Sequence, residues 1–147
     1  MAHGDAQIHA ALVTALTGLT TTGANVFDDE TTPIPEASLP ALRVLDDGVG
    51  QIEYATQRVP RTLLRTQGYT VRALCKIANA KSKVNTILAE VEAAVYANRT
   101  LGGIARDMRI EQVDKNFSDE LDTRVGEAAI TINVDWSCVE GSPQTPL

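Results

Sequence analysis

The chain has few of the residues that carry chemistry or covalent cross-links. Its 147 residues include two cysteines, two histidines and one tryptophan, and aromatic residues make up only 4%. Two cysteines argue against a disulfide framework and fit a reducing compartment. No run approaches the roughly 20 apolar residues that a membrane-spanning helix needs, and the first residues lack the pattern of a secretory signal. We therefore expect a cytoplasmic globular protein with an aliphatic core and no membrane partner.

Acidic residues are missing from one long segment, although the chain as a whole is acidic. Residues 54–89 contain no Asp or Glu, whereas the formal net charge of the whole chain is −6. Such segregation can make a surface complementary to another copy of the chain, or it can attract an external polyanion. The basic residues of this segment are Arg58, Arg61, Arg65, Arg72, Lys76, Lys81 and Lys83.

Hydrophobic periodicity predicts two helices. Residues 5–17 place Ile8, Leu12 and Leu16 on one face, and Asp5 is a candidate N-cap. Residues 82–97 carry a second apolar stripe, with Ser82 as the candidate N-cap. The stripe consists of Val84, Ile87, Leu88, Val91 and Val95.

Strand patterns fill most of the remaining chain. Residues 61–78 are predicted to form a β-hairpin that turns at Gln67 and Gly68. The second arm of that hairpin alternates between a buried face and a basic face, which includes Arg72 and Lys76. Further strands are expected at 24–27, 41–45, 104–113 and 124–138, with a strand or extended loop at 51–55 and a turn at 46–50.

This order of elements predicts an α+β fold. Two helices would pack on one face of a mixed, mainly antiparallel β-sheet with a long β-hairpin. Residues 1–139 are expected to form a single domain, and residues 140–147 an extended or disordered tail.

No pattern for catalysis, a cofactor or a metal is present. The sequence contains no phosphate-binding glycine motif and no nucleophile elbow. His3 and His9 are wrongly spaced for one helix face, and a zinc site would have to recruit Cys75 and Cys138 from distant strands. The carboxylate triplet at residues 28–30 is better explained as a solvated loop than as a Mg²⁺ or acid–base site. We predict no catalytic residue, no cofactor and no metal.

The basic segment has three interpretations. It can be a solvated sheet face that discourages edge pairing, a nucleic-acid-binding surface, or one half of a contact between copies of the chain. The low isoelectric point and the scarcity of aromatic residues argue against the second, and we favour the third. The candidate interface residues are Arg58, Arg61, Arg65, Arg72 and Lys76 on one side and Asp28, Asp29, Glu30, Asp119, Glu120 and Asp122 on the other.

Several phrases in this order resemble a known family. They are LTGLTTTG (16–23), NVF (25–27), LPALRV (39–44), an amphipathic helix beginning near Val84, and TLGG (100–103). Over residues 5–137 the chain is similar to the tail terminator, or tail completion, proteins of tailed bacteriophages, which include the lambda-type minor tail protein U. The resemblance implies a small fold of two helices on a mixed sheet.

The resemblance also implies a role and partners. Such proteins form a hexameric ring on the finished end of the tail tube, stop its polymerisation and present a surface to the head or neck proteins. DNA passes through the lumen without specific binding. From the net charge of −13 outside residues 54–89, we further hypothesise that acidic loops line this lumen and repel the phosphates. The alternatives are a neck or head-completion ring protein, and a small nucleic-acid-binding module that uses the basic hairpin.

Overall fold

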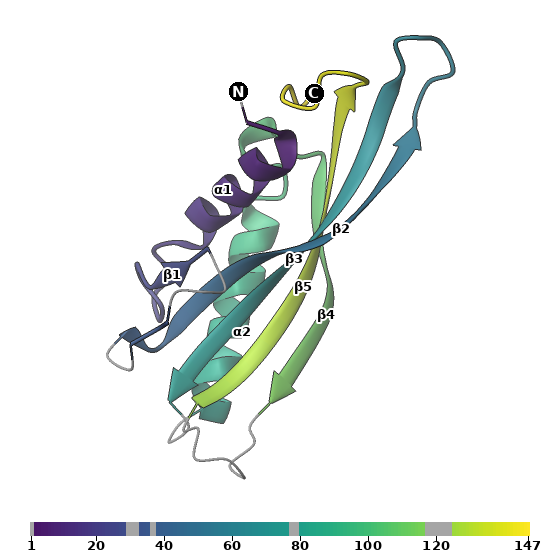
Figure 1. Ribbon diagram of the computed structural model, residues 1–147. Coiled ribbons are helices and arrows are strands. Elements are labelled where there is room, and N and C mark those ends of the chain that lie inside the picture. Colours follow the sequence, from purple (N-terminus) through teal and green to yellow (C-terminus); the bar gives the residue numbers. More distant parts are fainter. Residues whose placement is uncertain (1, 29–32, 36–37, 77–79, 117–124) are drawn as a thin grey trace.

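The structure is a computed structural model that describes residues 2–28, 33–35, 38–76, 80–116 and 125–147 (Figure 1). It has an α+β fold, as the sequence predicts. The helices are α1 (Gly4–Leu16) and α2 (Ala80–Ala97), with a short 3₁₀ turn at Leu101–Gly103. The strands are β1 (Val26–Phe27), β2 (Ala41–Tyr54), β3 (Thr62–Lys76), β4 (Asp107–Asn116) and β5 (Val125–Val139).

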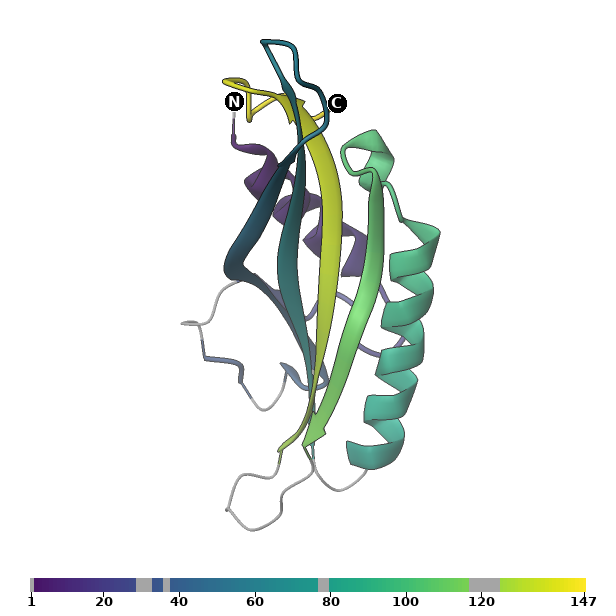
Figure 2. The same cartoon turned by 90° about the vertical axis from the view of Figure 1, so that its right-hand side faces the viewer.

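The strands form one mixed sheet in the order β1-β2-β3-β5-β4. Only the β1–β2 pair is parallel, and the other three pairs are antiparallel. Both helices pack on the same face of this sheet, and Figure 2 shows α2 running alongside β4 and β5. The opposite face carries no helix in the described part of the chain, so its side chains meet the solvent.

The core lies between the helices and the sheet. Alternate residues of β3 and β5 point toward the helices, and Val71, Ile130 and Ile132 have no exposed surface. Ile8 and Leu12 of α1 are likewise fully buried. The predicted stripe of α2 is confirmed, since all five of its members belong to the buried core.

The helices begin at residues other than those predicted. His3 is the N-cap of α1, because its Nδ1 accepts a hydrogen bond from the Asp5 amide at 3.1 Å. Asp5 instead binds the sheet. Its carboxylate accepts from Trp136 Nε1 at 3.0 Å, and its backbone carbonyl accepts from the Tyr69 hydroxyl at 2.9 Å. Ser82 lies inside α2, which already begins at Ala80.

The predicted hairpin at 61–78 is wrong. β3 continues through Gln67 and Gly68 without a turn, because these residues pair with Val134 and Asn133 of β5. Gly68 is not a turn residue, and a Cβ there would meet only the end of the Asp47 side chain, at 2.9 Å. The true long hairpin joins β2 to β3, and its tip is residues 55–61.

The predicted turn at 46–50 is a bulge inside β2. The register with β3 shifts between Asp46 and Gly50, and Gly48 has a φ of 74° that favours glycine. Asp46 Oδ1 accepts from the Gly48 amide and from Gln67 Nε2, both at 2.7 Å. The bulge therefore joins the predicted segments 41–45 and 51–55 into one bent strand.

The last eight residues fold back on the body instead of extending from it. The carbonyl of Pro143 accepts from the Gly4 amide at 2.8 Å, and the Leu147 amide donates to the Ser137 carbonyl at 2.8 Å. Gln7 Nε2 also donates to the Gln144 carbonyl at 2.8 Å. The sequence signal for an extended tail was misleading because these contacts are between distant residues.

Candidate interaction surface

The tip of the β2–β3 hairpin projects beyond the helices and the rest of the sheet (Figures 1 and 2), whereas residues 62–65 of β3 still pair with residues 136–139 of β5. We call residues 49–65 the arm. β1 pairs only with Leu42 and Arg43 of β2. Within the described chain, the outer backbone edge of residues 50–54 therefore faces no neighbouring strand. An uncovered edge of this kind is a surface on which another chain can pair.

The arm concentrates the exposed apolar side chains of the protein. Seven large hydrophobic residues are exposed in the described part of the chain, and four of them belong to the arm. Val49 and Val59 are each 70% exposed, Tyr54 is 58% exposed and Ile52 is 52% exposed. Apolar residues gathered on one projecting element indicate a binding surface more strongly than scattered ones do.

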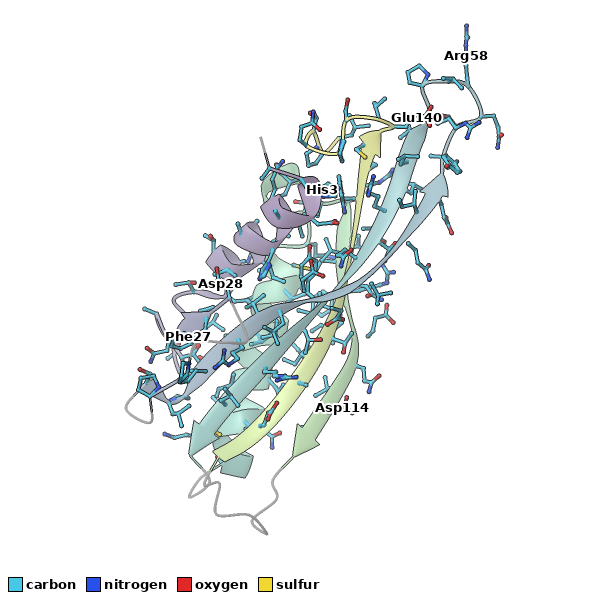
Figure 3. All side chains as sticks on the ribbon, in the orientation of Figure 1. His3, Phe27, Asp28, Arg58, Asp114 and Glu140 are labelled. Atoms are coloured by element: carbon cyan, nitrogen blue, oxygen red, sulfur yellow. The ribbon has the colours of Figure 1, made fainter. Side chains whose placement is uncertain are left out.

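Three arginines accompany these apolar residues. Arg58 lies at the tip of the arm (Figure 3). The guanidinium carbon of Arg61 lies 4.9 Å from the ring centre of Tyr54, and that of Arg65 lies 5.3 Å from the ring of Trp136. These distances are typical of cation–π contacts, which hold the cations against the arm without neutralising them.

Glu140 ties the arm to the body at Arg61, where the tip meets β3 (Figure 3). A carboxylate oxygen of Glu140 accepts from the Arg61 amide at 2.9 Å, and the Glu140 amide donates to the Arg61 carbonyl at 2.9 Å. The Thr56 hydroxyl accepts from the Thr62 amide at 3.0 Å and closes the tip. The arm is thus tied to the body where its tip meets β3, while Val49, Ile52, Tyr54 and Val59 stay exposed.

The predicted alternation of β3 is confirmed where the structure describes it, since Val71, Ala73 and Cys75 are buried and Arg72 lies on the open face. Arg65, which comes from the other predicted arm, does not join that face. Arg65 and Arg72 point to opposite sides of the sheet, because Arg65 pairs with the buried Trp136 and Arg72 pairs with Ala129 on the open face. On that face the nitrogen of Arg72 lies 3.5 Å from a carboxylate oxygen of Glu127. The neighbouring strand therefore supplies an acid that the sequence of the basic segment does not reveal. The side chain of Lys76 lies outside the described residues.

Few of the predicted acidic partners can be placed. Asp28 is exposed and lies far from Arg58 along the molecule (Figure 3). Asp28 and Arg72 line the same open cleft of about 570 Å³, together with Asp46 and Asp47. These two predicted interface residues are therefore neighbours within one copy. Asp29, Glu30, Asp119, Glu120 and Asp122 lie outside the described residues.

A second cleft on the open face was not predicted. It has a volume of about 470 Å³ and contains Arg106, Arg109 and Asp135 among its lining residues. Arg109 donates to Asp135 at 2.6 Å and to Glu111 at 2.8 Å, and the bond to Asp135 is the main cause that raises the pKa of Arg109. Asp135 could have been noticed in the sequence as one of two acids, with Glu127, in the alternating final strand.

The described residues hold no cluster suited to metal binding. They contain no group of three or more His, Cys, Asp and Glu residues that could hold an ion. His9 Nε2 lies 3.0 Å from the Val44 carbonyl, and both cysteines are buried without a disulfide. Burial raises the pKa of Cys75 and, together with nearby Asp5, that of Tyr69. Both groups therefore stay protonated and unreactive at neutral pH.

No helix among the described residues is long and apolar enough to cross a membrane.

Comparisons with known proteins add a structural likeness. No model of a known protein family matches the sequence, and the search of curated proteins finds no match either. Among solved structures, the fold is similar to a chain of the "virion of native gene transfer agent (GTA) particle". That likeness covers 90% of each chain, with a TM-score of 0.41 and 12% sequence identity. A likeness of this size leaves the function to be argued from the chain's own residues.

Proposed function

We propose that the chain is a structural virion protein that forms a ring on the end of a phage tail tube. The ring would end polymerisation of the tube protein and present the attachment surface for the head or neck. The observation that carries this proposal is the projecting arm, which gathers exposed apolar and basic side chains on an otherwise acidic protein. The phrases shared with tail terminators, and a fold that matches their layout, point in the same direction.

A ring requires that each copy offers two different surfaces. A contact between unlike surfaces repeats from copy to copy and closes when the rotation permits. The arm is one such surface, and the acidic body is the other. The number six is taken from the family resemblance, and so are the tail tube and the head or neck as further partners.

The set of interface residues predicted from the sequence can be reduced. Arg58, Arg61 and Arg65 lie on the arm and remain candidates for a contact between copies. Arg72 lies beside Glu127 in its own copy at 3.5 Å, so it is the weaker candidate. We propose that the acids at positions 28–30 and 119–122 contribute to the acidic side, with DNA passing through the lumen without a specific site.

The experiment is an assembly assay with tail tubes of a phage whose terminator gene has been deleted. Purified full-length chain is added to polymerising tube protein, and tube length is measured by electron microscopy. We expect tubes of limited length, with a ring of density at one end. Molar mass is measured in parallel by light scattering, with and without tubes. A chain that stays monomeric and leaves tube length unchanged would contradict the proposed function.

The alternative of a neck or head-completion ring protein is separated by the choice of template. Binding to empty heads in preference to tubes would favour it. The nucleic-acid-binding alternative loses support from the geometry, because the basic residues of segment 54–89 do not share one face. Arg58 lies at the arm tip, whereas Lys83 lies in the first turn of α2 at the other end of the molecule (Figure 1).

A further inference from the structure

The β2 side of the arm is more exposed than the part of β2 near the core, although Leu63, which lies opposite Tyr54 on β3, still belongs to the core. Ile52 and Tyr54 occupy the face of β2 that carries Leu42 and Val44 nearer the core, as their pairing with Arg65 and Leu63 of β3 shows. Leu42 and Val44 are fully buried under the helices, whereas Ile52 and Tyr54 are more than half exposed. The same face of β2 is thus buried under the helices in the first half of the strand and exposed in the second half.

Charge distinguishes the possible occupants of this uncovered face. Three arginines and Glu53 give the arm a formal net charge of +2, which leaves −8 for the remainder of the chain. Two arms facing one another would bring like charges together, and such a juxtaposition disfavours the pairing. An arm against the body of another copy brings opposite charges together. The charge pattern therefore selects a contact between unlike surfaces.

We infer that the arm is the donor half of a head-to-tail contact, in which its uncovered face binds the acidic body of a second copy. This inference rests on the proposed function and assigns the side chains that would make the contact. Ile52, Tyr54 and Val59 supply the affinity by burying apolar surface. Arg58 and Arg61 set the orientation and increase the association rate. The open backbone edge at residues 50–54 allows the contact to include main-chain hydrogen bonds.

Two arm variants of the full-length chain test this inference. The first combines I52S, Y54S and V59S, and the second is R58E. Each has a matched control elsewhere on the surface, V113S for the apolar change and K83E for the charge change. All six substitutions in these four variants are at exposed positions, so thermal unfolding should be close to that of the wild type.

Self-association of each variant is measured by sedimentation, and stoichiometry is measured on tail tubes. We expect the triple variant to weaken the contact by about a hundredfold and R58E by about tenfold. The controls should stay within about twofold of the wild type. Added salt should weaken the wild-type contact more than that of R58E, because the variant has already lost part of the electrostatic attraction.

A mixing experiment separates a head-to-tail contact from an arm-to-arm contact. The triple variant keeps its acidic body, so it should accept the arm of a wild-type copy while offering none of its own. Substoichiometric amounts should then stop ring closure by the wild type. Exclusion of the variant from mixed assemblies would overturn the inference.

The outcomes of this test and of the tube assay remain distinguishable. Arm variants that assemble like the wild type overturn the arm as the donor surface, while wild-type rings on tubes still support the proposed function. A wild-type chain that neither self-associates nor binds tubes overturns both. Loss of assembly by the controls to the same extent as by the arm variants also overturns the assignment to the arm.

Discussion

The two halves of the β2–β3 hairpin have similar alternating sequences, but apolar residues are buried in one half and exposed in the other. In the half near the core, Val44 and Val71 are paired and fully buried beneath the helices. In the arm, Ile52 occupies the same face and is 52% exposed. The difference lies in what covers this face of β2. The helices bury its first half, and the strand extends past the part that they cover. An apolar side chain that a chain does not cover itself is available for another chain to cover.

The largest expected difference between the core and the arm is in the free energy of unfolding. L12A removes a fully buried side chain of α1 and should lower the free energy of unfolding by about 2–5 kcal/mol. I52A removes an exposed side chain of the arm and should change it by about 0.5 kcal/mol or less. Both are measured by urea denaturation of a dilute, monomeric sample. Equal losses for the two variants would mean that the arm belongs to the core.

A smaller contrast is expected between two glycines. A Cβ at Gly4 would lie 2.3 Å from the ring of Trp136, which is held in the core. G4A should therefore cost about 1–3 kcal/mol through overpacking. G68A is the control, because the atom it would meet is the end of the Asp47 side chain, which can move. Thermal unfolding should rank G4A clearly below G68A, and the reverse order would contradict this packing.

A substitution in the bulge between the two halves should lower stability and change hydrogen exchange at the bulge. D46A removes the acceptor for both Gly48 and Gln67, and Gln67 is only 7% exposed. Leaving its buried amide without a partner should cost about 1–3 kcal/mol. In D46A, amide hydrogen exchange should become faster than in the wild type at residues 46–50 before it becomes faster in the paired strands β3 and β5. Unchanged protection at the bulge would show that Asp46 does not hold it.

The smallest effect is expected at Arg72 on the open face. Its partner Glu127 lies 3.5 Å away, and both side chains are about 40% exposed. R72A should change stability by about 0.2–1 kcal/mol, as exposed ion pairs usually do. Self-association should stay the same, in contrast to R58E. A loss of assembly in R72A equal to that in R58E would remove the distinction between the open face and the arm.

The helices and the fold class could be predicted from the sequence because they depend on local periodicity. The α2 stripe is regular, and every member of it is buried. The hairpin was misplaced because Gln67-Gly68 resembles a turn, whereas β5 pairs with both residues and keeps the strand straight. The bulge at 46–50 contains the glycine that a turn would need, so the same residues fit either structure.

The arm could be predicted only in part. Its arginines were visible as part of a basic segment, but the sequence did not show which face of the sheet Arg65 would occupy. Tyr54 and Ile52 gave no signal of exposure, because alternation shows that a strand has two faces and not what covers them. The fold had to be seen before the apolar residues of the arm could be separated from those of the core.

The backbone contact between Gly4 and Pro143 brings the two ends of the chain together, on the side of the molecule from which the arm projects (Figures 1 and 2). An affinity tag on either end would therefore sit near the arm and compete for the space that a neighbouring copy needs. A circularly permuted chain avoids this problem. A short linker can join the present ends, and new ends can be opened in another exposed loop.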